Sequence, residues 1–99
     1  MNMKIIRIQE FIDNVKSIKD EKLSAAIAQR LVRIINGNFG DHKSLGGGIF
    51  ELRIHYGAGY RIYYAIRGKE VILLLCAGSK SDQDRDIKKA KELNKEVRI

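Results

Sequence analysis

Three strand-like segments follow one another between residues 49 and 77, and only short turns that contain glycine separate them. The segments run from Ile49 to Tyr56, from Tyr60 to Arg67 and from Val71 to Ala77, and their connections are "GAG" and "GKE". Turns this short join antiparallel neighbours, because a parallel crossover needs a dozen or more residues. We therefore predict an antiparallel meander as the centre of the fold.

The remaining segments predict one further strand and three helices. Residues 3–8, "MKIIRI", are short and rich in isoleucine, which is typical of a strand. Apolar residues then recur at helical spacing in two stretches before Gly37, which suits a left-handed cap. At the start of the last helix, Ser81 and Asp84 have the spacing of a capping box.

These elements define the expected fold class, an α+β domain. The glycine-rich segment 37–48 is expected to be a loop, which leaves four strands in an antiparallel-rich sheet. An N-terminal helical hairpin would cover one face and a C-terminal helix would lie near the other, in the order β-α-α-β-β-β-α. Since the chain has 99 residues and no repeat or linker, we expect a single domain over residues 1–99.

The last strand of the meander is apolar without interruption from Val71 to Cys76. Such a run is typical of a strand that is covered on both faces. Cys76 lies within it, so we expect a buried and unreactive thiol. As the only cysteine in the sequence, it can form no internal disulfide, and this fits a reducing, cytoplasmic compartment.

The chain is strongly basic, with 19 Lys and Arg residues against 12 Asp and Glu residues and a net charge of +7. A basic domain attracts polyanions such as RNA, DNA, acidic lipid or an acidic protein. The longest apolar run is far shorter than the ~20 residues of a membrane-spanning helix, and the N-terminus lacks the pattern of a secretory signal. We therefore expect no membrane association.

Motifs for cofactors and metals are missing from the sequence. "GAGYRI" lacks the third glycine of a dinucleotide fingerprint, and "GSKS" lacks the upstream glycine of a phosphate loop. The two histidines, His42 and His55, have no acidic residue at a useful local spacing, which disfavours a metal site. We expect neither a metal nor a cofactor.

The strands on either side of the "GAG" turn divide by parity into an apolar face and a polar face. Arginine forks to phosphate oxygens, and tyrosine or histidine can stack on a base, so the polar face is a candidate RNA-binding surface. The alternative is a solvated sheet face on which Arg53 pairs with Glu51 or with Tyr63. Like charges that face each other across the hairpin cost stability unless an anion screens them. The polar face comprises Glu51, Arg53, His55, Arg61, Tyr63 and Arg67.

Residues of these types could cleave RNA without a metal, because RNA carries its own nucleophile, the 2′-hydroxyl. The reaction needs a base for the 2′-hydroxyl proton, cations for the charge on the phosphorane and an acid for the leaving 5′-oxygen. Histidine, lysine, arginine and tyrosine can share these roles. Lys80 lies near a helix start, where the dipole disfavours a cation, so a functional role as an additional cation stands beside that of an ordinary surface lysine.

Two stretches together, "GNFGDHKSLGGGIFELRIHYGAGYRIYY" and "ILLLCAGSKSDQDRDIKKAKEL", resemble the addiction-module killer proteins. These are a subgroup of the RelE/HigB-type toxins of bacterial toxin–antitoxin systems and are close to a phage-derived, Gp49-like family. The resemblance runs from about Arg7 to Glu92 and rests on "GNFGD", "ELRI", "GYR" and the lysine-containing loop before "QDRDI" in combination. The order of elements predicted above is also that of the RelE fold.

The resemblance implies a small endoribonuclease, or mRNA interferase, that enters the ribosomal A site and cuts messenger RNA without a metal. It also implies three partners, namely a cognate antitoxin that blocks the protein, the ribosome and mRNA. By its match to "GYR", Arg61 would be the phosphate-binding arginine. Arg53 of "ELRI" would lie on the neighbouring strand, and Lys80 matches the basic position in the loop after the last strand.

The sequence departs from the better-studied toxins at two places. The residue after the loop lysine is often arginine but is Ser81 here, and the C-terminal segment "KELNKEVRI" offers neither tyrosine nor histidine as a proton donor. His55 or Tyr63 would take that role. The main alternative function is a non-catalytic nucleic-acid or ribosome binder with the same basic face. A third is a module whose only remaining partner is the antitoxin.

Overall fold

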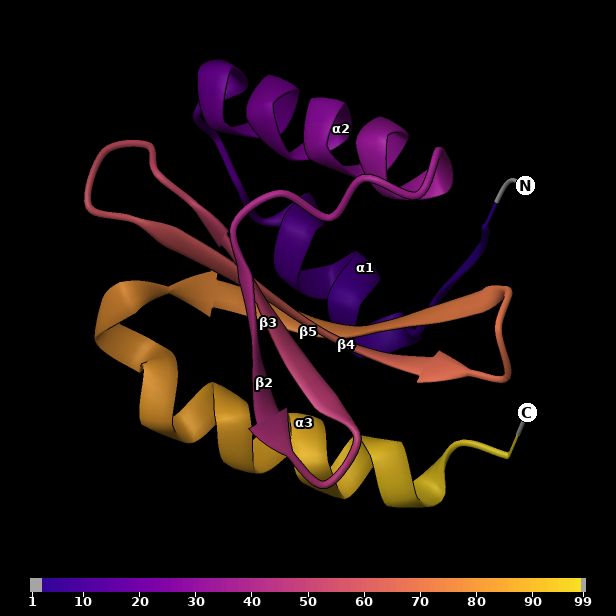
Figure 1. Cartoon of the computed structure of the whole chain (residues 1–99). Coiled ribbons are helices and arrows are strands. Elements are labelled where there is room, and N and C mark those ends of the chain that lie inside the picture. Colours follow the sequence, from indigo (N-terminus) through magenta and orange to yellow (C-terminus); the bar gives the residue numbers. More distant parts are fainter. Residues whose placement is uncertain (1–2, 99) are drawn as a thin grey trace.

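The computed structural model describes residues 3–98, which form a five-stranded sheet with helices packed on both faces (Figure 1). In chain order the elements are β1 (Lys4–Arg7), α1 (Gln9–Lys16), α2 (Glu21–Ile35), β2 (His42–Gly46), β3 (Ile49–Ile54), β4 (Tyr60–Arg67), β5 (Val71–Ser79), a short 3₁₀ turn (Lys80–Asp82) and α3 (Gln83–Glu96). The strand order is β1-β5-β4-β3-β2, with β1 parallel to β5 and the other neighbours antiparallel. In Figure 1, α1 and α2 lie above the sheet and α3 lies below it. None of these helices is long and apolar enough to cross a membrane, within the residues described.

The architecture confirms the predicted α+β fold, with its antiparallel meander, its helical hairpin on one face and its last helix on the other. The predicted number of strands is wrong, because the segment 37–48 contains β2 as well as a loop. β2 forms an edge of the sheet next to β3, its register shifts between Ser44 and Gly46, and most of its side chains are exposed. An exposed edge strand buries too little to require an alternating apolar pattern, so the sequence carried no strand signal there.

The helical hairpin packs on one face of the sheet through the apolar stripes that the sequence predicted. Phe11 of α1 and Ile27, Leu31 and Ile34 of α2 are buried against side chains of β3, β4 and β5. α2 ends at Ile35, and Gly37 has a φ of +86°, which confirms the predicted left-handed residue after the helix.

α3 covers the opposite face of the sheet. Its Ala90 is buried in a second apolar cluster with Leu73 and Leu75 of β5, so β5 is covered on both faces as its uninterrupted apolar run predicted. Cys76 lies in the same cluster and is buried, as predicted. Burial raises the pKa of the Cys76 thiol to about 12, and the thiol is therefore protonated and unreactive at neutral pH.

The start of α3 differs from the predicted capping box. The chain first makes the 3₁₀ turn over Lys80–Asp82, so Asp82 and not Ser81 occupies the N-cap position of α3. The Ser81 hydroxyl lies 2.9 Å from the hydroxyl of Ser79 instead. This turn places Lys80 at the end of the sheet, beside the hairpin between β3 and β4.

Candidate active site

Part of the predicted polar face is covered by α3, and two of its residues, Glu51 and Tyr63, are buried. Tyr63 is fully buried, and its hydroxyl has no hydrogen-bond partner among the described residues. Burial, together with the nearby charge of Glu51, raises the pKa of this hydroxyl far above its ordinary value. Arg67 is also engaged, since its guanidinium donates a hydrogen bond to the backbone carbonyl of Asn94 at 3.1 Å. The structure therefore leaves Tyr63 out of reach of a ligand that approaches from solvent.

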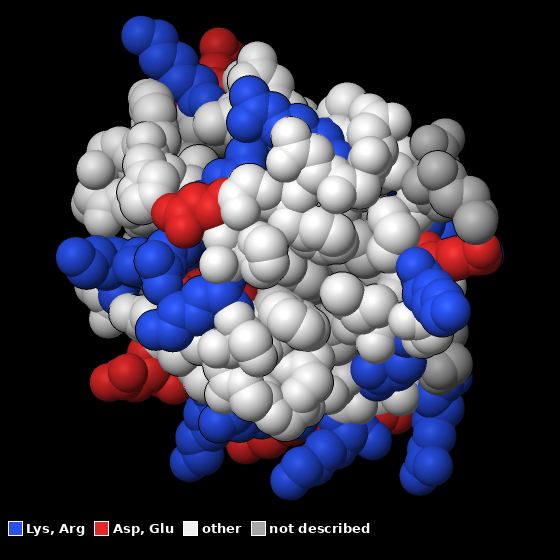
Figure 2. Space-filling model, in the orientation of Figure 1, with Lys and Arg blue, Asp and Glu red and all other residues white. Residues whose placement is uncertain are grey.

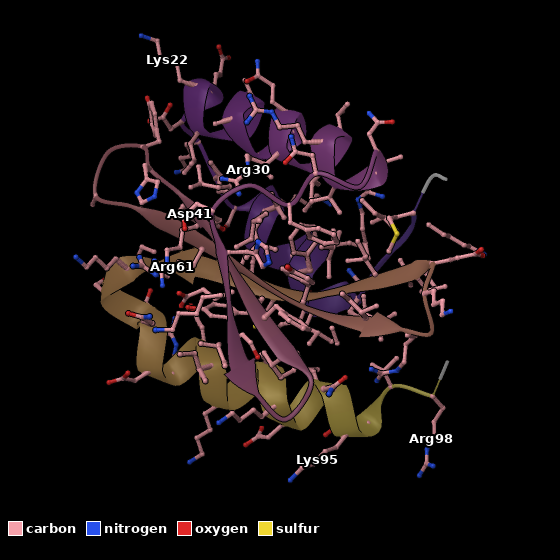
Figure 3. The ribbon with its side chains drawn as sticks, in the orientation of Figure 1. Lys22, Arg30, Asp41, Arg61, Lys95 and Arg98 are labelled. Atoms are coloured by element: carbon pink, nitrogen blue, oxygen red, sulfur yellow. The ribbon has the colours of Figure 1, made fainter. Side chains whose placement is uncertain are left out.

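The open end of this face forms a cleft of about 350 Å³. Arg53 on β3, His55 just after β3, Arg61 on β4 and Lys80 after β5 line the cleft, together with the backbone of the turn at residues 57–59. Four of the predicted site residues thus come together from three segments of the chain. In Figure 2, basic side chains gather at the left of the view, around the position that Figure 3 labels Arg61.

A buried carboxylate lies beneath the two arginines of the cleft. Arg53 and Arg61 are direct partners across β3 and β4, an arrangement that is unfavourable for like charges. Glu51, which is 0% exposed, has its two oxygens 3.1 Å from Nε of Arg53 and 3.5 Å from Nε of Arg61. Gln83 of α3 donates a hydrogen bond to the same carboxylate at 2.8 Å. The screening anion is therefore part of the protein, and of the two partners that the alternative interpretation offered Arg53, the structure shows Glu51.

This anchoring leaves the outer nitrogens of Arg61 for a ligand. The contact with Glu51 is at the inner nitrogen, Nε, and it is an ion pair whose geometry does not meet that of a hydrogen bond. The Arg61 side chain is only 13% exposed, whereas that of Arg53 is 31% exposed. A guanidinium held by its inner edge can present its outer edge to a phosphate as a fork.

His55 pairs with an acidic residue that the sequence did not reveal. Its Nε2 contacts Oδ2 of Asp41, and Oδ1 of Asp41 lies 3.8 Å from the guanidinium of Arg53. The hydrogen bond from His55 is the main reason that the pKa of Asp41 lies below its ordinary value, and the charge of Arg53 lowers it further. The expectation that no acid accompanies His55 held only for local spacing, since Asp41 is 14 residues away in the sequence.

Arg30 of α2 holds Asp41 in this position. Its guanidinium donates hydrogen bonds to the backbone carbonyls of Phe39 at 2.9 Å, of Asp41 at 3.2 Å and of Arg53. Gly40 sits within this clamp at a φ of +64°, and a Cβ there would lie 3.0 Å from Nη2 of Arg30. Figure 3 shows Arg30 and Asp41 between α2 and the sheet. No sequence pattern distinguished Arg30 from other basic residues of an amphipathic helix.

Lys80 is tied to the cleft through its backbone. Its N–H donates a hydrogen bond to the carbonyl of Gly59 at 3.3 Å, and its side chain is exposed and forms no ion pair within the described residues. Gly59 has a φ of +92°, and a Cβ at this position would point toward both Lys80 and Arg61. The glycine thus lets the turn, the arginine and the lysine meet in a small space.

The arrangement is suited to an anionic ligand that also undergoes proton transfer. Two guanidinium groups and an ammonium group can bind phosphate oxygens, and a histidine oriented by a carboxylate can exchange a proton. Within residues 3–98, no three His, Cys, Asp or Glu side chains gather closely enough to hold a metal ion.

Comparison with known proteins places this chain in a family. The family described as "Phage derived protein Gp49-like (DUF891)" matches residues 6–96. An uncharacterized protein of Haemophilus influenzae strain Rd is 43% identical over 97 residues, which are 98% of this chain and 98% of that protein. A solved structure of a mutant of the E. coli toxin RelE in the free state has a TM-score of 0.75 at 13% identity, over 93% of this chain and 97% of that one. The chain belongs to the Gp49-like family of phage-derived proteins and has the fold of RelE, as its sequence motifs predicted.

Proposed function

We propose that this protein is the toxin of a type II toxin–antitoxin system, a ribosome-dependent endoribonuclease that cuts messenger RNA without a metal. The observation that carries the proposal is the cleft in which Arg53, His55, Arg61 and Lys80 surround one open space above a buried carboxylate. The likeness to the RelE fold and the net charge of +7 support it.

His55 acts as the general base in the proposed reaction. Its Nε2 faces Asp41, so Nε2 carries the ring proton and Nδ1 carries the lone pair. Nδ1 takes the proton of the 2′-hydroxyl, and the 2′-oxygen then attacks the adjacent phosphorus. Asp41 orients the ring and stabilises the positive charge that it acquires, while Arg30 holds Asp41 in place.

Arg61 and Arg53 stabilise the phosphorane, whose extra negative charge develops as the 2′-oxygen attacks. The bond between phosphorus and the 5′-oxygen then breaks, and Lys80 supplies the proton that the leaving oxygen requires. The products are a 2′,3′-cyclic phosphate and a free 5′-hydroxyl. Tyr63 has no part in this scheme, because its hydroxyl is buried under α3.

The proposed partners are the ribosome, mRNA and a cognate antitoxin that blocks the cleft or the approach to the ribosome. The protein would act in the cytoplasm, where its substrate is translated. A reading frame for a short helix-turn-helix protein beside this one would supply the antitoxin.

The cellular test is induction of the protein alone and together with its neighbouring reading frame. We expect growth arrest in the first case and relief in the second. Arg61→Ala should abolish the arrest, whereas Lys95→Ala, which removes the same charge at the far end of α3, should retain it (Figure 3). Unchanged growth in the presence of abundant, folded parent protein would contradict the toxin function.

A non-catalytic binder of ribosomes is the second candidate, because the basic cleft alone would serve it. Such a protein would sediment with ribosomes and arrest growth without new RNA ends. Sedimentation of the parent protein with ribosomes, combined with mapping of mRNA 5′ ends, separates the two functions.

A further inference from the structure

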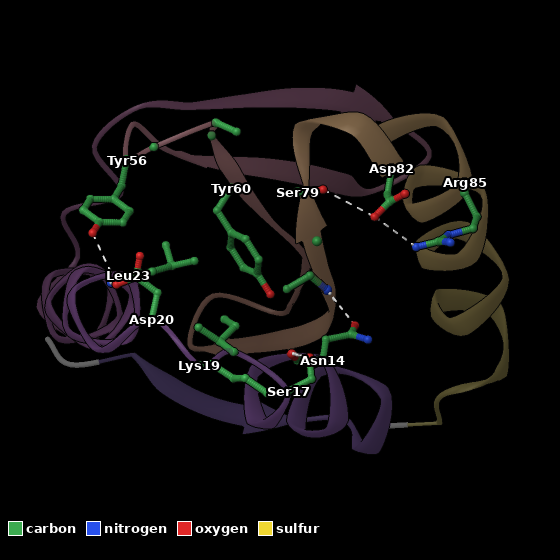
Figure 4. A pocket seen from close by; sticks show the side chains of 16 residues that line it. Asn14, Ser17, Lys19, Asp20, Leu23, Tyr56, Tyr60, Ser79, Asp82 and Arg85 are labelled. Atoms are coloured by element: carbon green, nitrogen blue, oxygen red, sulfur yellow. Dashed lines mark hydrogen bonds and ion pairs between the residues drawn. The ribbon is translucent and has the colours of Figure 1, made fainter.

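A second hollow, of about 490 Å³, adjoins the cleft. The turn at residues 57–59 and Tyr60 line both spaces, so the turn of the β3–β4 hairpin forms the wall between them. Figure 4 shows this hollow between the turn that joins α1 to α2, the hairpin and the start of α3. Its function is not accounted for by the reaction described above.

The hollow differs from the cleft in its charge. Its charged side chains are two acids and two bases, so their formal charges balance. Arg85 lies 3.3 Å from Oδ2 of Asp82, and Asp20 accepts a hydrogen bond from the Tyr56 hydroxyl at 3.3 Å, while Lys19 lies on the rim. The cleft, in contrast, is lined by cations. The hollow is therefore poorly suited to a phosphate and better suited to a neutral polar group.

Two tyrosines give the hollow an aromatic character. Tyr56 is half-buried, and Tyr60 projects into the hollow, as Figure 4 shows. Burial raises the pKa of the Tyr60 hydroxyl to about 12, so at neutral pH this group is uncharged and can donate a hydrogen bond. Ser79 adds a hydroxyl at the side of α3. Aromatic rings with nearby donors and acceptors are the features that bind a nucleobase.

We propose that this hollow is a nucleobase subsite, which receives the base of a nucleotide next to the phosphate in the cleft. The proposal rests on the proposed function, because it assumes that RNA occupies the cleft. The wall between the spaces carries little side-chain bulk, since Gly57 and Gly59 have no side chains and no heavy atom lies within 4 Å of where a Cβ of Gly57 would be. The sugar–phosphate chain can cross this wall closely, with phosphate on one side and base on the other.

The direct test is an NMR titration of the parent protein with inorganic phosphate and with the four nucleoside 5′-monophosphates. Phosphate alone should shift the side-chain resonance of Arg61 and leave the ring resonances of Tyr56 unchanged. At least one nucleotide should shift both. Nucleotides that shift only the cleft resonances, as phosphate does, would overturn the proposal.

A pair of variants tests the contribution of the aromatic ring. Tyr56→Ala removes the ring, whereas Tyr56→Phe keeps it and deletes only the hydroxyl. We expect Tyr56→Ala to weaken nucleotide binding about tenfold or more, which corresponds to the lower part of the ~1–3 kcal/mol of one stacked base, and to leave phosphate binding unchanged. Tyr56→Phe should bind nucleotides nearly as the parent does. Equal nucleotide affinity of Tyr56→Ala and the parent would contradict a stacked base.

A cleavage experiment separates this proposal from the proposed function. Ribosome-bound mRNAs that lack the base on one side or the other of the scissile phosphate are compared with intact mRNA. The parent protein and Tyr56→Phe should each cut one of the two abasic mRNAs more slowly than they cut intact mRNA. Tyr56→Ala should cut that abasic mRNA and intact mRNA at the same rate. Cleavage that is indifferent to both missing bases refutes the subsite and leaves the nuclease intact. Nucleotide-induced shifts at Tyr56 without cleavage of any mRNA refute the nuclease and leave the subsite intact.

Discussion

The carboxylate of Glu51 lies 3.5 Å from Nε of Arg61, and it does so from a fully buried position under the cleft. The same carboxylate contacts Arg53, so one acid positions both arginines. We predict that Glu51→Gln folds but cleaves mRNA about 10²-fold more slowly, because a small displacement of a phosphate-binding group has an effect of that size. The loss should appear in kcat more than in KM. Glu92→Gln, the same change on the exposed face of α3, is the control.

A structural role alone would change the stability of the Glu51→Gln protein without changing kcat at a temperature where the fold is intact. The urea midpoint and kcat are therefore measured on the same preparation. Parent-like kcat in the folded variant would remove Glu51 from the positioning of the arginines.

The pairing of Asp41 with His55 predicts a dependence of stability on pH. The pKa of Asp41 is lower in the folded than in the unfolded chain, so the pairing stabilises the fold above the unfolded value, about 4, and this stability is lost as the pH falls through the folded value. The free energy of unfolding should therefore be higher for the parent than for Asp41→Asn at pH 6, and the difference should be smaller at pH 2.5, because the carboxylate binds a proton as the pH falls. Urea unfolding at both pH values, repeated at high salt, measures the effect, which salt should reduce because the carboxylate is exposed. A difference that persists unchanged at pH 2.5 would show that charge is not its cause.

Replacement of His55 tests the proton transfer. His55→Gln should retain ribosome binding, since Arg53, Arg61 and Lys80 remain, but should slow cleavage by about 10²- to 10⁴-fold. His42→Gln is the matched control, because His42 is also exposed but does not line the cleft. Parent-like cleavage by His55→Gln would assign the base to another group.

Gly78 lies so close to Asp86 that a side chain at position 78 should clash with the Asp86 carboxylate, and a second substitution at Asp86 should relieve the clash. A Cβ at Gly78 would lie 2.0 Å from Oδ2 of the buried Asp86 carboxylate. Gly78→Ala should lower the free energy of unfolding by about 1–3 kcal/mol, as overpacking does. Adding Asp86→Ala should restore most of this loss, because it removes the clashing oxygen. Denaturant unfolding of the four proteins of this cycle checks the coupling, and simple additivity would speak against the clash.

The strands with a buried face could be predicted from the sequence, and the edge strand could not. β4 begins and ends where its alternating pattern predicted, at Tyr60 and Arg67, because both of its faces are covered by helices. β2 is exposed along most of its length, so no burial requirement shaped its residues. Its formation depends on the backbone of β3, which is a contact that no local pattern records.

The site could be predicted where it follows strand parity and not where it depends on distant segments. Parity placed Arg53 and Arg61 on one face, and their pairing across the strands followed from the short turn. Parity could not show that α3 covers Tyr63, because the apolar stripe of a helix does not say which part of a sheet it covers. The contact of Asp41 with His55 depends on the clamp by Arg30, which joins α2 to the loop before β2.

The central claim is that this cleft cleaves mRNA on the ribosome, and the measurement that tests it most directly is the mapping of mRNA 5′ ends after incubation with purified ribosomes. The parent protein and Lys95→Ala should produce the same new 5′-hydroxyl ends at the same rate, and neither should need an added catalytic metal ion. Arg61→Ala, folded as judged by circular dichroism, should produce them about 10²- to 10³-fold more slowly, as expected for the loss of one group that stabilises the transition state. Absence of new ends with the parent protein, or cleavage by Arg61→Ala at the parent rate, would contradict the account.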